Sequence, residues 1–538
     1  MDKNRVIITV VLCLVITVGW NYLAEYMGWL PKPVQQTAVE ETATTGSNSP
    51  EQVQPAQNTP APELPVFKSE NGRTVTVDTP LYTAVFHSNG GVLQSFVLKN
   101  YKAENTPESP NVDLIGKPAS AFAPLGLLLD GKRTWENAAW RVKGSDLTLE
   151  DGKNGMLVFV GEVDGLRVER EFSFTADNYT ITEKTNIINA GDSPRNVRLD
   201  YTLDTDSMTD EGNPYNKTRI AWFTDSEGLD TEDDVEDLGN GISSTLPMMW
   251  AGVESNYFIA AIAPKSADLA MKAKYLSGVY RVALEKDNIG IAPGNMSSVS
   301  TTYYLGPKIS KYLAAAPNVL SAAEDYGFFT VLAVPMLKMI NFFEQYVGNY
   351  GVAIILLTIL IKIAFWPLSR KSYKSMEAMK KLQPMMQKIR EKYADDREKQ
   401  NQEVMALYKT YKVNPVGGCL PMVIQIPVFF GLYQALLNAI QLRHASFIDY
   451  LPFTDMPWLS DLSAPDPYYI TPIVMGATML LQQLLSPSTG DPTQRRMMLI
   501  MPVVFTFMFL NFPAGLVVYW LVNNVLSIFQ QWLMLRKA

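Results

Sequence analysis

The sequence predicts a polytopic α-helical membrane protein with six transmembrane helices, five of them forming a core, and a large extracytoplasmic β-sandwich domain. Apolar stretches of spanning length recur after residue 345, and one more lies at the N-terminus. A strand-like region, residues 65–316, separates them. Only 19% of the 538 residues are charged, against about 25% in ordinary soluble proteins.

Composition argues against several familiar classes of protein. The formal net charge of −8 disfavours a DNA-binding function. Two cysteines, Cys13 and Cys419, cannot build a disulfide scaffold or a four-cysteine zinc site. Two histidines, His87 and His444, leave little material for a histidine metal cluster or a Ser/His/Asp triad. We therefore expect no catalytic residues, metal site or cofactor, and no DNA partner.

The N-terminal residues 1–30 are interpreted as an uncleaved signal anchor. Lys3 and Arg5 precede an apolar stretch from Val6 to Trp20, which is close to the length needed to span a bilayer. No A-x-A cleavage site follows, and a cleaved signal peptide is the alternative. The basic residues before the stretch predict a cytoplasmic N-terminus.

The region after the anchor is therefore expected outside the cytoplasm. Residues 31–64 are rich in Pro, Thr, Gln, Ala and Glu without an apolar period, which predicts a disordered linker. Residues 65–316 have a strand-like pattern of alternation and β-branched residues, as in Thr74–Val77 and Met156–Val160. Gly-containing turn signals such as Asn89–Gly91 separate these runs. Many short strands with such turns predict a large β-sandwich.

The predicted sandwich gives little indication of chemistry. The acidic run Glu232–Asp237 lacks the glycine and the spacing of an EF-hand loop, so we interpret it as a solvated acidic loop rather than a calcium site. A sugar enzyme would need paired carboxylates, and one sequence does not show which acidic residues converge. We expect an interaction or spacer domain.

Residues 317–345 have two interpretations. Their apolar part, 326–343, is long enough for another span, but Pro335, Lys338 and Asn341 interrupt it. A span here would also place the basic segment that follows on the outside, against the positive-inside rule. We therefore predict an amphipathic helix that lies in the outer interface of the membrane.

Residues 346–538 are predicted to form a core of five membrane-spanning helices. Apolar stretches lie at 347–367, 420–440, 468–485, 497–512 and 514–534. Segment 368–418 holds 12 Lys or Arg and 6 Asp or Glu residues, whereas segment 441–467 holds one Arg and four Asp. Because basic loops stay in the cytoplasm, both termini are expected there and the large domain outside.

The basic stretch 368–413 is interpreted as a hairpin of two charged helices. These are expected at about 370–393 and 397–412, with a kink at Pro384 and a turn at Asp395–Asp396. The hairpin is either a solvated connector or a basic, Met-rich docking arm for ribosomal RNA, lipid headgroups or partner helices. The docking residues would be Lys374, Lys380, Lys381, Lys388, Arg390 and Lys392.

Lys362 is the informative charge within the predicted spans. A lysine near the centre of an isolated helix costs about 2.5–3.5 kcal/mol. It lies shortly before Trp366, so snorkelling to the headgroups is one interpretation. The other is a hydrated groove, because the five apolar stretches contain no Asp, Glu or His to neutralise it. The other groove residues would be Thr358, Gln425, Gln434, Tyr519, Trp520, Asn523, Asn524 and Ser527.

Short motifs also occur in the predicted core. They are Asn414–Pro421 (NPVGGCLP) with Gln425–Pro427 (QIP), Asp466–Ile470 (DPYYI) and Phe512–Leu516 (FPAGL). They resemble the signature of the YidC/Oxa1/Alb3 family of membrane protein insertases, and the resemblance covers the whole chain. The large outer domain resembles the Gram-negative form, which implies a β-supersandwich. The family has a positive groove residue, usually Arg, where this chain has Lys362, which keeps the charge without the bidentate fork.

The resemblance implies an insertase and chaperone of the bacterial inner membrane that is not an enzyme. Such a protein would integrate and help fold inner-membrane proteins through a positively charged groove open to cytoplasm and lipid. Implied partners are nascent membrane proteins, membrane lipids, the Sec translocon (SecYEG and SecDF), the ribosome and the signal recognition particle receptor. A secondary transporter, or a scaffold or sensor that uses the periplasmic domain, is the alternative.

Overall fold

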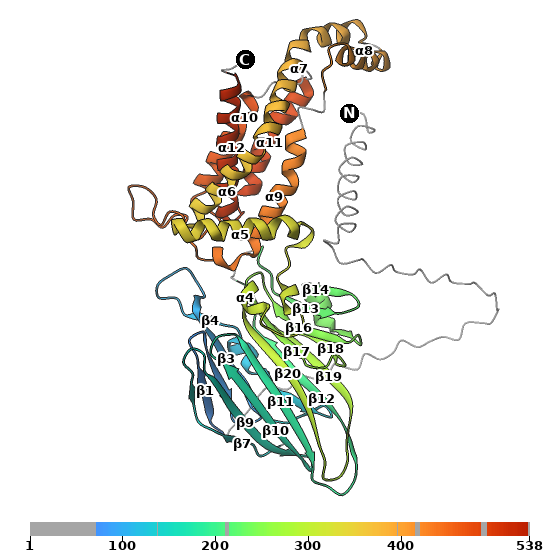
Figure 1. Cartoon of the computed structure of the whole chain (residues 1–538), viewed down its shortest axis with the longest axis vertical. Helices are drawn as coiled ribbons and strands as arrows, with labels where there is room; N and C mark the ends of the chain where they lie inside the picture. The colour runs from blue at the N-terminus through green and yellow to red at the C-terminus, as the bar shows by residue number, and fades with distance from the viewer. Residues whose placement is uncertain are drawn as a thin grey trace, which may run out of the picture.

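The computed structural model describes residues 72–136, 138–209, 215–394, 396–414, 420–485 and 492–535. Figure 1 shows a β-rich domain joined to a bundle of long helices, in agreement with the predicted fold class at this level. The predicted signal anchor (1–30) and linker (31–64) lie outside the described residues, as do residues 415–419 of the first motif.

The β-rich domain contains three sheets of mainly antiparallel strands. The first has the order β4 (Asn111–Asp113), β3 (Val92–Lys102), β2 (Tyr82–His87), β1 (Thr74–Asp78) and β8 (Leu147–Thr148). The second has the order β14 (Gly228–Glu232), β13 (Arg219–Thr224), β16 (Met248–Glu254), β17 (Phe258–Pro264), β20 (Met296–Pro307), β11 (Thr180–Asn189), β10 (Leu166–Thr175), β9 (Asn154–Val163) and β7 (Arg141–Lys143). The third has the order β15 (Ile242–Ser244), β18 (Ala270–Leu276), β19 (Val279–Ile291), β12 (Arg195–Thr205), β5 (Leu127–Leu129) and β6 (Lys132–Arg133).

The alternating sequence pattern forms strands where it was expected to. The runs Thr74–Val77 and Met156–Val160 fall within β1 and β9. The turn Asn89–Gly91 joins β2 to β3, and Gly90 there has a φ of 78°. A Cβ on Gly90 would lie 2.8 Å from the Cβ of Trp135, so both backbone conformation and space require glycine.

A buried ion pair lies inside the β-rich domain. Arg170 on β10 and Glu183 on β11 are both fully buried, and Arg170 Nε donates to Glu183 Oε1 at 2.6 Å. The guanidinium also donates to the carbonyls of Gly90 and Leu125, while Tyr303 donates to the carboxylate. These added hydrogen bonds offset the desolvation of the two charges and join the second sheet to the chain segments after β2 and before β5.

The acidic run Glu232–Asp237 takes a more ordered form than the predicted loop. Its last three residues begin the short helix α3 (Val235–Asn240). Asp234 precedes this helix, and its side chain accepts hydrogen bonds from the backbone N–H groups of Glu236 and Asp237. An acidic cap of this kind stabilises a helix N-terminus. Stabilisation of α3 therefore explains why some residues of this run are acidic.

Asp200 is a buried carboxylate on the outward face of the third sheet. It is 4% exposed, and Arg198 Nε lies 3.1 Å from Asp200 Oδ1. Burial raises the pKa of Asp200 to about 6, although Arg198 acts in the opposite direction. Its charged form is therefore retained in the folded domain at a cost in stability.

The helical part of the chain begins after β20. The short helix α4 (Ser310–Leu313) and the 3₁₀ segments Leu320–Ala323 and Gly327–Phe329 come first, whereas the short helices α2 (Gly116–Ser120) and α3 lie within the β-rich domain. The long helices are α5 (Thr330–Val347), α6 (Tyr350–Ala364), α7 (Trp366–Lys392), α8 (Arg397–Thr410), α9 (Leu420–Asn438), α10 (Ile470–Leu485), α11 (Pro492–Phe509) and α12 (Ala514–Leu535). A 3₁₀ turn at Ile440–Leu442 follows α9.

Helix α5 lies differently from the other long helices. In Figure 1 it runs across the direction of α6 and α12, at the end of the bundle next to the β-rich domain. The segment Gly327–Val347 has 21 residues and a mean hydropathy of 1.3, so length and composition alone would also allow a span. At the other end, α6 and α7 meet at a bend of 60°.

The loop between α9 and α10 contacts the β-rich domain. Arg443 donates to the backbone carbonyls of Lys102 and Ala103 at 2.6 and 2.8 Å. The side-chain amide of Asn105 donates to the carbonyl of Ser460 at 2.8 Å. These bonds join the long strand β3 to the loop, and so link the domain to the bundle beyond the chain connection at α4.

Asp466 explains the DPYYI motif. Its carboxylate is 1% exposed and accepts hydrogen bonds from Trp458 Nε1 and from the backbone N–H groups of Tyr468 and Thr471. The Thr471 hydroxyl donates to it as well, at 2.7 Å. The motif therefore caps the start of α10.

The FPAGL motif fastens the start of α12 to the same loop. The backbone N–H groups of Ala514 and Gly515 donate to the carbonyls of Ala464 and Leu462 at 2.8 and 2.9 Å. A Cβ on Gly515 would lie 3.2 Å from the carbonyl oxygen of Leu462, tighter than usual contacts. The two motifs together set the positions at which α10 and α12 enter the bundle.

Replacing Asp200 by Asn should stabilise the β-rich domain in a pH-dependent way. The folded-state pKa is raised above the ordinary value of 3.8, so the stability cost of ionisation is present above about pH 6 and is lost as the pH falls toward the unfolded-state value. We expect a gain of about 1–3 kcal/mol above that pH, measured by thermal unfolding of the full chain in detergent.

The exposed Asp192→Asn is the matched control and should change the unfolding temperature little at any pH. A stabilisation by Asp200→Asn that is equal at low and neutral pH would contradict the role assigned to the buried charge.

Replacing Asp466 by Ala should destabilise the helical part by about 2–4 kcal/mol, because a helix cap is lost and the N–H of the half-buried Trp458 loses its acceptor. Denaturant unfolding followed by tryptophan fluorescence would measure this change. Asp455→Ala, in the same loop but exposed, is the control. Equal stability of the two variants would show that the cap contributes nothing.

Candidate functional site

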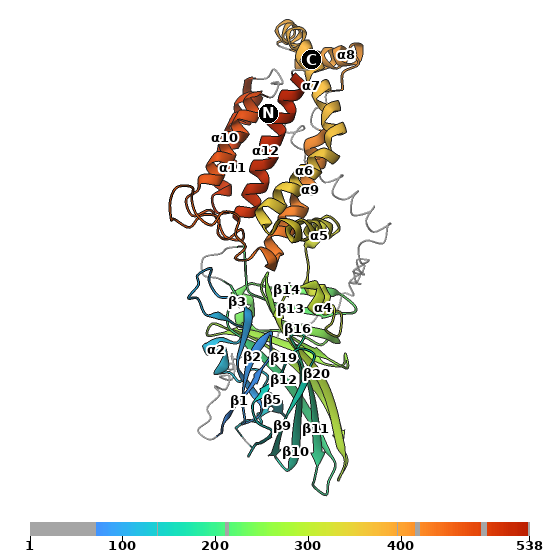
Figure 2. The same cartoon turned by 60° about the vertical axis from the view of Figure 1, so that its left-hand side comes forward.

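The helical bundle contains a cavity of about 620 Å³ between four helices, α9, α10, α11 and α12. Figure 2 shows α10, α11 and α12 on one side of the bundle and α9 with α6 on the other. Five of the predicted groove residues line the cavity: Gln425, Tyr519, Trp520, Asn523 and Asn524. Gln482 and Gln483, near the end of α10, line it as well.

A chain of hydrogen bonds connects Lys362 to the wall of the cavity. Lys362 lies in the last turn of α6, and its ammonium donates to the Ser527 hydroxyl at 2.7 Å. Ser527 in turn donates to the backbone carbonyl of Asn523 at 2.7 Å. The side-chain carbonyl of Asn523 accepts from the Gln425 amide at 2.6 Å. Three helices, α6, α12 and α9, thus contribute to one polar network.

Among the residues that the structure describes, Lys362 has no counter-ion. Its side chain is half-buried and points toward α12 rather than away from the bundle. No carboxylate of the described residues lies within ion-pairing distance of it. A neutral hydroxyl holds the ammonium in place without cancelling its charge, so the site can attract an anionic group.

Four of the predicted groove residues do not line the cavity. Thr358 is 1% exposed, and its hydroxyl donates to the carbonyl of Ile354 in its own helix at 2.7 Å. Gln434 accepts a hydrogen bond from Asn438, also within one helix, α9. Both are polar side chains whose hydrogen bonds are satisfied locally. Lys362 and Ser527 are also absent from the lining, and their hydrogen bonds connect them to Asn523 in the cavity wall.

The other predicted residues of α12 have distinct surroundings. Tyr519 is 1% exposed, and Asn524, 4% exposed, points toward the Thr478 hydroxyl of α10 at 3.5 Å. The Trp520 ring packs edge-on against Phe429 with ring centroids 4.7 Å apart. The indole N–H of Trp520 is buried without a hydrogen-bond partner among the described residues. Trp520 therefore serves as a wall of the cavity.

Most of the cavity wall is apolar, and sequence reasoning missed it. Its aromatic and methionine residues include Phe429, Phe430, Tyr433, Met479, Met498, Met501, Phe505, Met508, Phe509 and Phe512. On α11 the spacing of Met501, Phe505 and Met508 places them on one helix face. That signal is weak, because α11 is apolar on several faces. Flexible methionines and flat rings suit apolar side chains of varied shape.

The helices that form the cavity walls have different packing partners. A Cβ on Gly476 of α10 would lie 1.9 Å from the Thr506 hydroxyl of α11, so these helices touch where only glycine fits. Helix α10 also packs against α12. Helix α9 instead packs mainly against α5, where Gly431 approaches Leu332.

The outer faces of the bundle are covered by exposed apolar side chains. Examples are Leu360 and Ile363 on α6, Ile473 and Leu484 on α10, Ile500 and Phe507 on α11, and Phe529 and Trp532 on α12. A contiguous apolar surface of this kind would be unfavourable in water, whereas helices with internally satisfied backbones are suited to lipid.

The basic stretch 368–413 contains two helices, α7 and α8, at the positions where two charged helices were predicted. Tyr408 of α8 donates to the Met386 sulfur of α7 at 3.4 Å, and Asp396 caps α8 by accepting from the Lys399 backbone. Pro384 lies within α7. Among the predicted docking residues, Lys374, Lys380, Lys381, Lys388 and Lys392 are exposed and Arg390 is half-buried. Lys381 pairs with Glu377 at 2.9 Å.

Comparison with known families covers both parts of the chain. Residues 342–538 match the family described as 60Kd inner membrane protein, and residues 74–339 match the YidC periplasmic domain. Proteins named membrane protein insertase YidC from Nitratidesulfovibrio vulgaris (strain DP4) and Oleidesulfovibrio alaskensis are each 56% identical, over 100% of both chains. The protein of that name from Geobacter sulfurreducens is 38% identical, over 99% of this chain and 98% of its own. The chain therefore belongs to the YidC family of membrane protein insertases, which act in the inner membrane and carry a periplasmic domain.

Proposed function

We propose that this insertase works through the cavity between α9 and α11, with Lys362 as the group that draws substrate into it. The observation that carries the proposal is the hydrogen-bond chain from Lys362 through Ser527 and Asn523 to Gln425. It links an uncompensated cation to a cavity with both polar and apolar walls. A nascent membrane segment needs both, because its polar end must cross the apolar layer that its helix will occupy.

The charge of Lys362 would act on acidic residues in the segment that is exported. At a separation of about 4 Å and an effective dielectric of about 20, such a pair gains about 4 kcal/mol before desolvation. That gain is comparable with the cost of about 2.5–3.5 kcal/mol for a charge at the centre of a spanning helix. The attraction therefore lowers the free-energy barrier to moving the acidic segment into the membrane, and it is too weak to hold the substrate there. The membrane potential assists an acidic segment outward by about 2.3 kcal/mol per charge at 100 mV.

The apolar wall would guide the substrate's helix. Once the polar end is held near Asn523 and Gln425, the apolar segment can lie against Phe429, Phe505 and their neighbours. These side chains lie on the two helices that flank the cavity, α9 and α11, from which the segment passes sideways into lipid. No covalent chemistry is required, in keeping with a family of insertases rather than enzymes.

The arrangement in the membrane belongs to the same proposal. We infer six spans: the signal anchor in residues 1–30 and helices α6, α9, α10, α11 and α12. Helix α5 lies in the outer interface, which its orientation across the bundle in Figure 1 supports. The positive-inside rule then places both termini and the hairpin in the cytoplasm.

The exposed lysines of the hairpin would serve as a docking surface. The hairpin helices α7 and α8 that carry them extend to the end of the bundle opposite α5, as Figure 1 shows. Such a surface suits anionic partners, namely ribosomal RNA and lipid headgroups. The Sec translocon and the signal recognition particle receptor are the proposed protein partners, beside the nascent membrane proteins themselves.

A charge series at Lys362 tests the electrostatic part of the proposal. We expect Lys362→Arg to keep activity, Lys362→Ala to lower it, and Lys362→Glu to lower it by about tenfold or more, since repulsion replaces a gain of several kcal/mol. The measurement is insertion of a single-span substrate with an acidic exported tail into proteoliposomes.

The control for that series is Lys184→Glu, the same reversal at an exposed site in the periplasmic domain. A substrate whose tail has neutral residues in place of the acidic ones should respond less to all three Lys362 variants. Full activity of Lys362→Glu with the acidic substrate would refute capture by charge.

Photo-crosslinking tests the route along the cavity. A benzoylphenylalanine at Phe505, in the cavity wall, should crosslink to a stalled nascent membrane segment several-fold more than one at Phe529, an exposed Phe on the outer side of α12. Crosslinks of equal yield from both positions would show that the substrate moves along the lipid surface and not through the cavity.

A further inference from the structure

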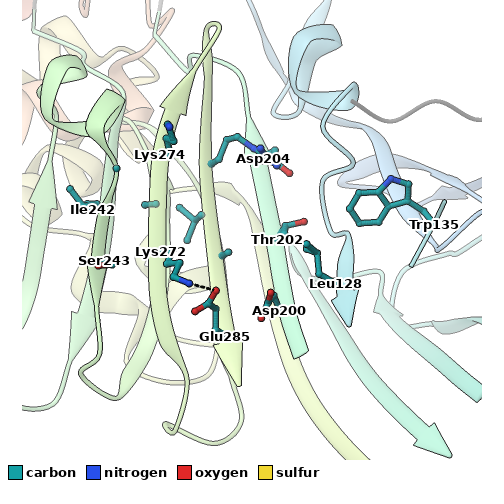
Figure 3. A pocket seen from close by; sticks show the side chains of 15 residues that line it. Leu128, Trp135, Asp200, Thr202, Asp204, Ile242, Ser243, Lys272, Lys274 and Glu285 are labelled. Carbon is teal, nitrogen blue, oxygen red and sulfur yellow. Dashed lines mark hydrogen bonds and ion pairs between the residues drawn. The ribbon is translucent and has the colours of Figure 1, made fainter. Parts of the chain in front are cut away.

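A second cavity, of about 430 Å³, lies on the outward face of the six-stranded sheet in the periplasmic domain (Figure 3). Antiparallel pairing sets the side chains of this face in three rows. The rows are Lys274–Arg281–Asp204, Ser243–Lys272–Ala283–Thr202 and Glu285–Asp200–Leu128. The insertion mechanism proposed above makes no use of any of these residues.

The hollow has a simple cause in the sequence. The small residues Ala283 and Thr202 stand side by side at the middle of the face, while longer side chains surround them. Leu128 and the indole of Trp135 close the side toward β5 and β6, as Figure 3 shows. A cavity with this shape has a polar floor and one apolar wall, and its volume is in the range of small-molecule sites.

The charges that line the cavity cancel. Three carboxylates, Asp200, Asp204 and Glu285, face three cations, Lys272, Lys274 and Arg281. The ammonium of Lys272 lies 2.7 Å from the carboxylate of Glu285, and Arg281 forms an ion pair with Asp204. A charged ligand of either sign would meet like charges within the same small space.

The lining also keeps unused hydrogen-bonding capacity. Asp204 Oδ2, Arg281 Nη1 and Trp135 Nε1 are buried and have no hydrogen-bond partner among the described residues. Asp204 and Trp135 are 0% and 4% exposed, and the side chain of Arg281 is 11% exposed. Buried polar groups without a hydrogen-bond partner are unfavourable. A ligand that both donates and accepts hydrogen bonds would therefore stabilise this face of the sheet.

We propose that this cavity binds a small, uncharged, polyhydroxylated molecule of the size of a mono- or disaccharide. A hydroxyl group donates to a carboxylate and accepts from an ammonium or guanidinium, so it matches a floor where the two alternate. The carbon face of a sugar ring would lie against Trp135 and Leu128. The periplasmic domain thereby has a ligand site of its own, remote from the helical bundle.

Binding of a defined set of probes to the full chain tests this site. The protein is kept in a detergent without a sugar headgroup. Isothermal titration calorimetry then measures its binding of glucose, galactose, N-acetylglucosamine and maltose. Inorganic phosphate and methylammonium serve as anionic and cationic probes. We expect at least one sugar to bind and neither ion to compete with it.

Two variants locate the binding. Ala283→Leu fills the middle of the hollow, and Lys272→Met removes a donor while it keeps the length of the side chain; each should weaken sugar binding by about tenfold or more. Ala315→Leu, at an exposed position, is the matched control. Thermal unfolding of each variant checks that the domain remains folded, and the Lys272 variant keeps the test decisive if Ala283→Leu is unstable.

Three results would overturn the proposal. Sugar binding that persists undiminished in folded Ala283→Leu and Lys272→Met would place the ligand elsewhere. Binding of phosphate or methylammonium at this site in preference to every sugar would show a charged ligand. Failure of all four sugars to bind at the highest soluble concentration would remove the ligand class. None of these results bears on insertion, so the proposed function is tested separately.

Discussion

The hydrogen bond from Lys362 to Ser527 is the contact on which the functional interpretation of the bundle depends. An ammonium at the end of a spanning helix needs polar surroundings, and a membrane offers few. Here a hydroxyl, a backbone carbonyl and two side-chain amides supply them in sequence across three helices. Because the partners are neutral, the positive charge remains available, and the same contacts that stabilise the lysine orient it toward the cavity wall.

Sequence periodicity and composition were sufficient to predict the helices. They were insufficient to predict the cavity between those helices. Long apolar stretches gave the five core helices within a few residues, since hydrophobicity along one segment decides their existence. The cavity depends on which helix faces which. Thr358 and Gln434 looked equivalent to Gln425 in the sequence, yet they form local hydrogen bonds within their own helices. The aromatic wall of α11 was hidden because nearly every residue from Met497 to Phe509 is apolar, so no helix face stands out.

In the β-rich domain too, single elements could be predicted from the sequence, whereas their arrangement could not. Alternation and glycine turns identified strands such as β1 and β9, because each strand carries its own period of two. The order of twenty strands in three sheets depends on pairings between distant segments, for which a single sequence gives no local signal. The rows of opposite charge across β18, β19 and β12 appear only once that register is known. The acidic run at Glu232–Asp237 was likewise ambiguous, since a capped helix and an open loop share the same composition.

The contact between Gly476 and Thr506 has a mechanical consequence. Helices that meet at a glycine cannot approach further, and separating them would open a gap that no side chain fills. Helices α10 and α11 are therefore expected to keep a fixed position relative to each other. Helix α9 packs mainly against α5, where a Cβ on Gly431 would lie 2.8 Å from the Cβ of Leu332. The cavity thus lies between two pairs of helices that each meet at a glycine, α10 with α11 and α9 with α5, so close contact fixes the spacing within each pair.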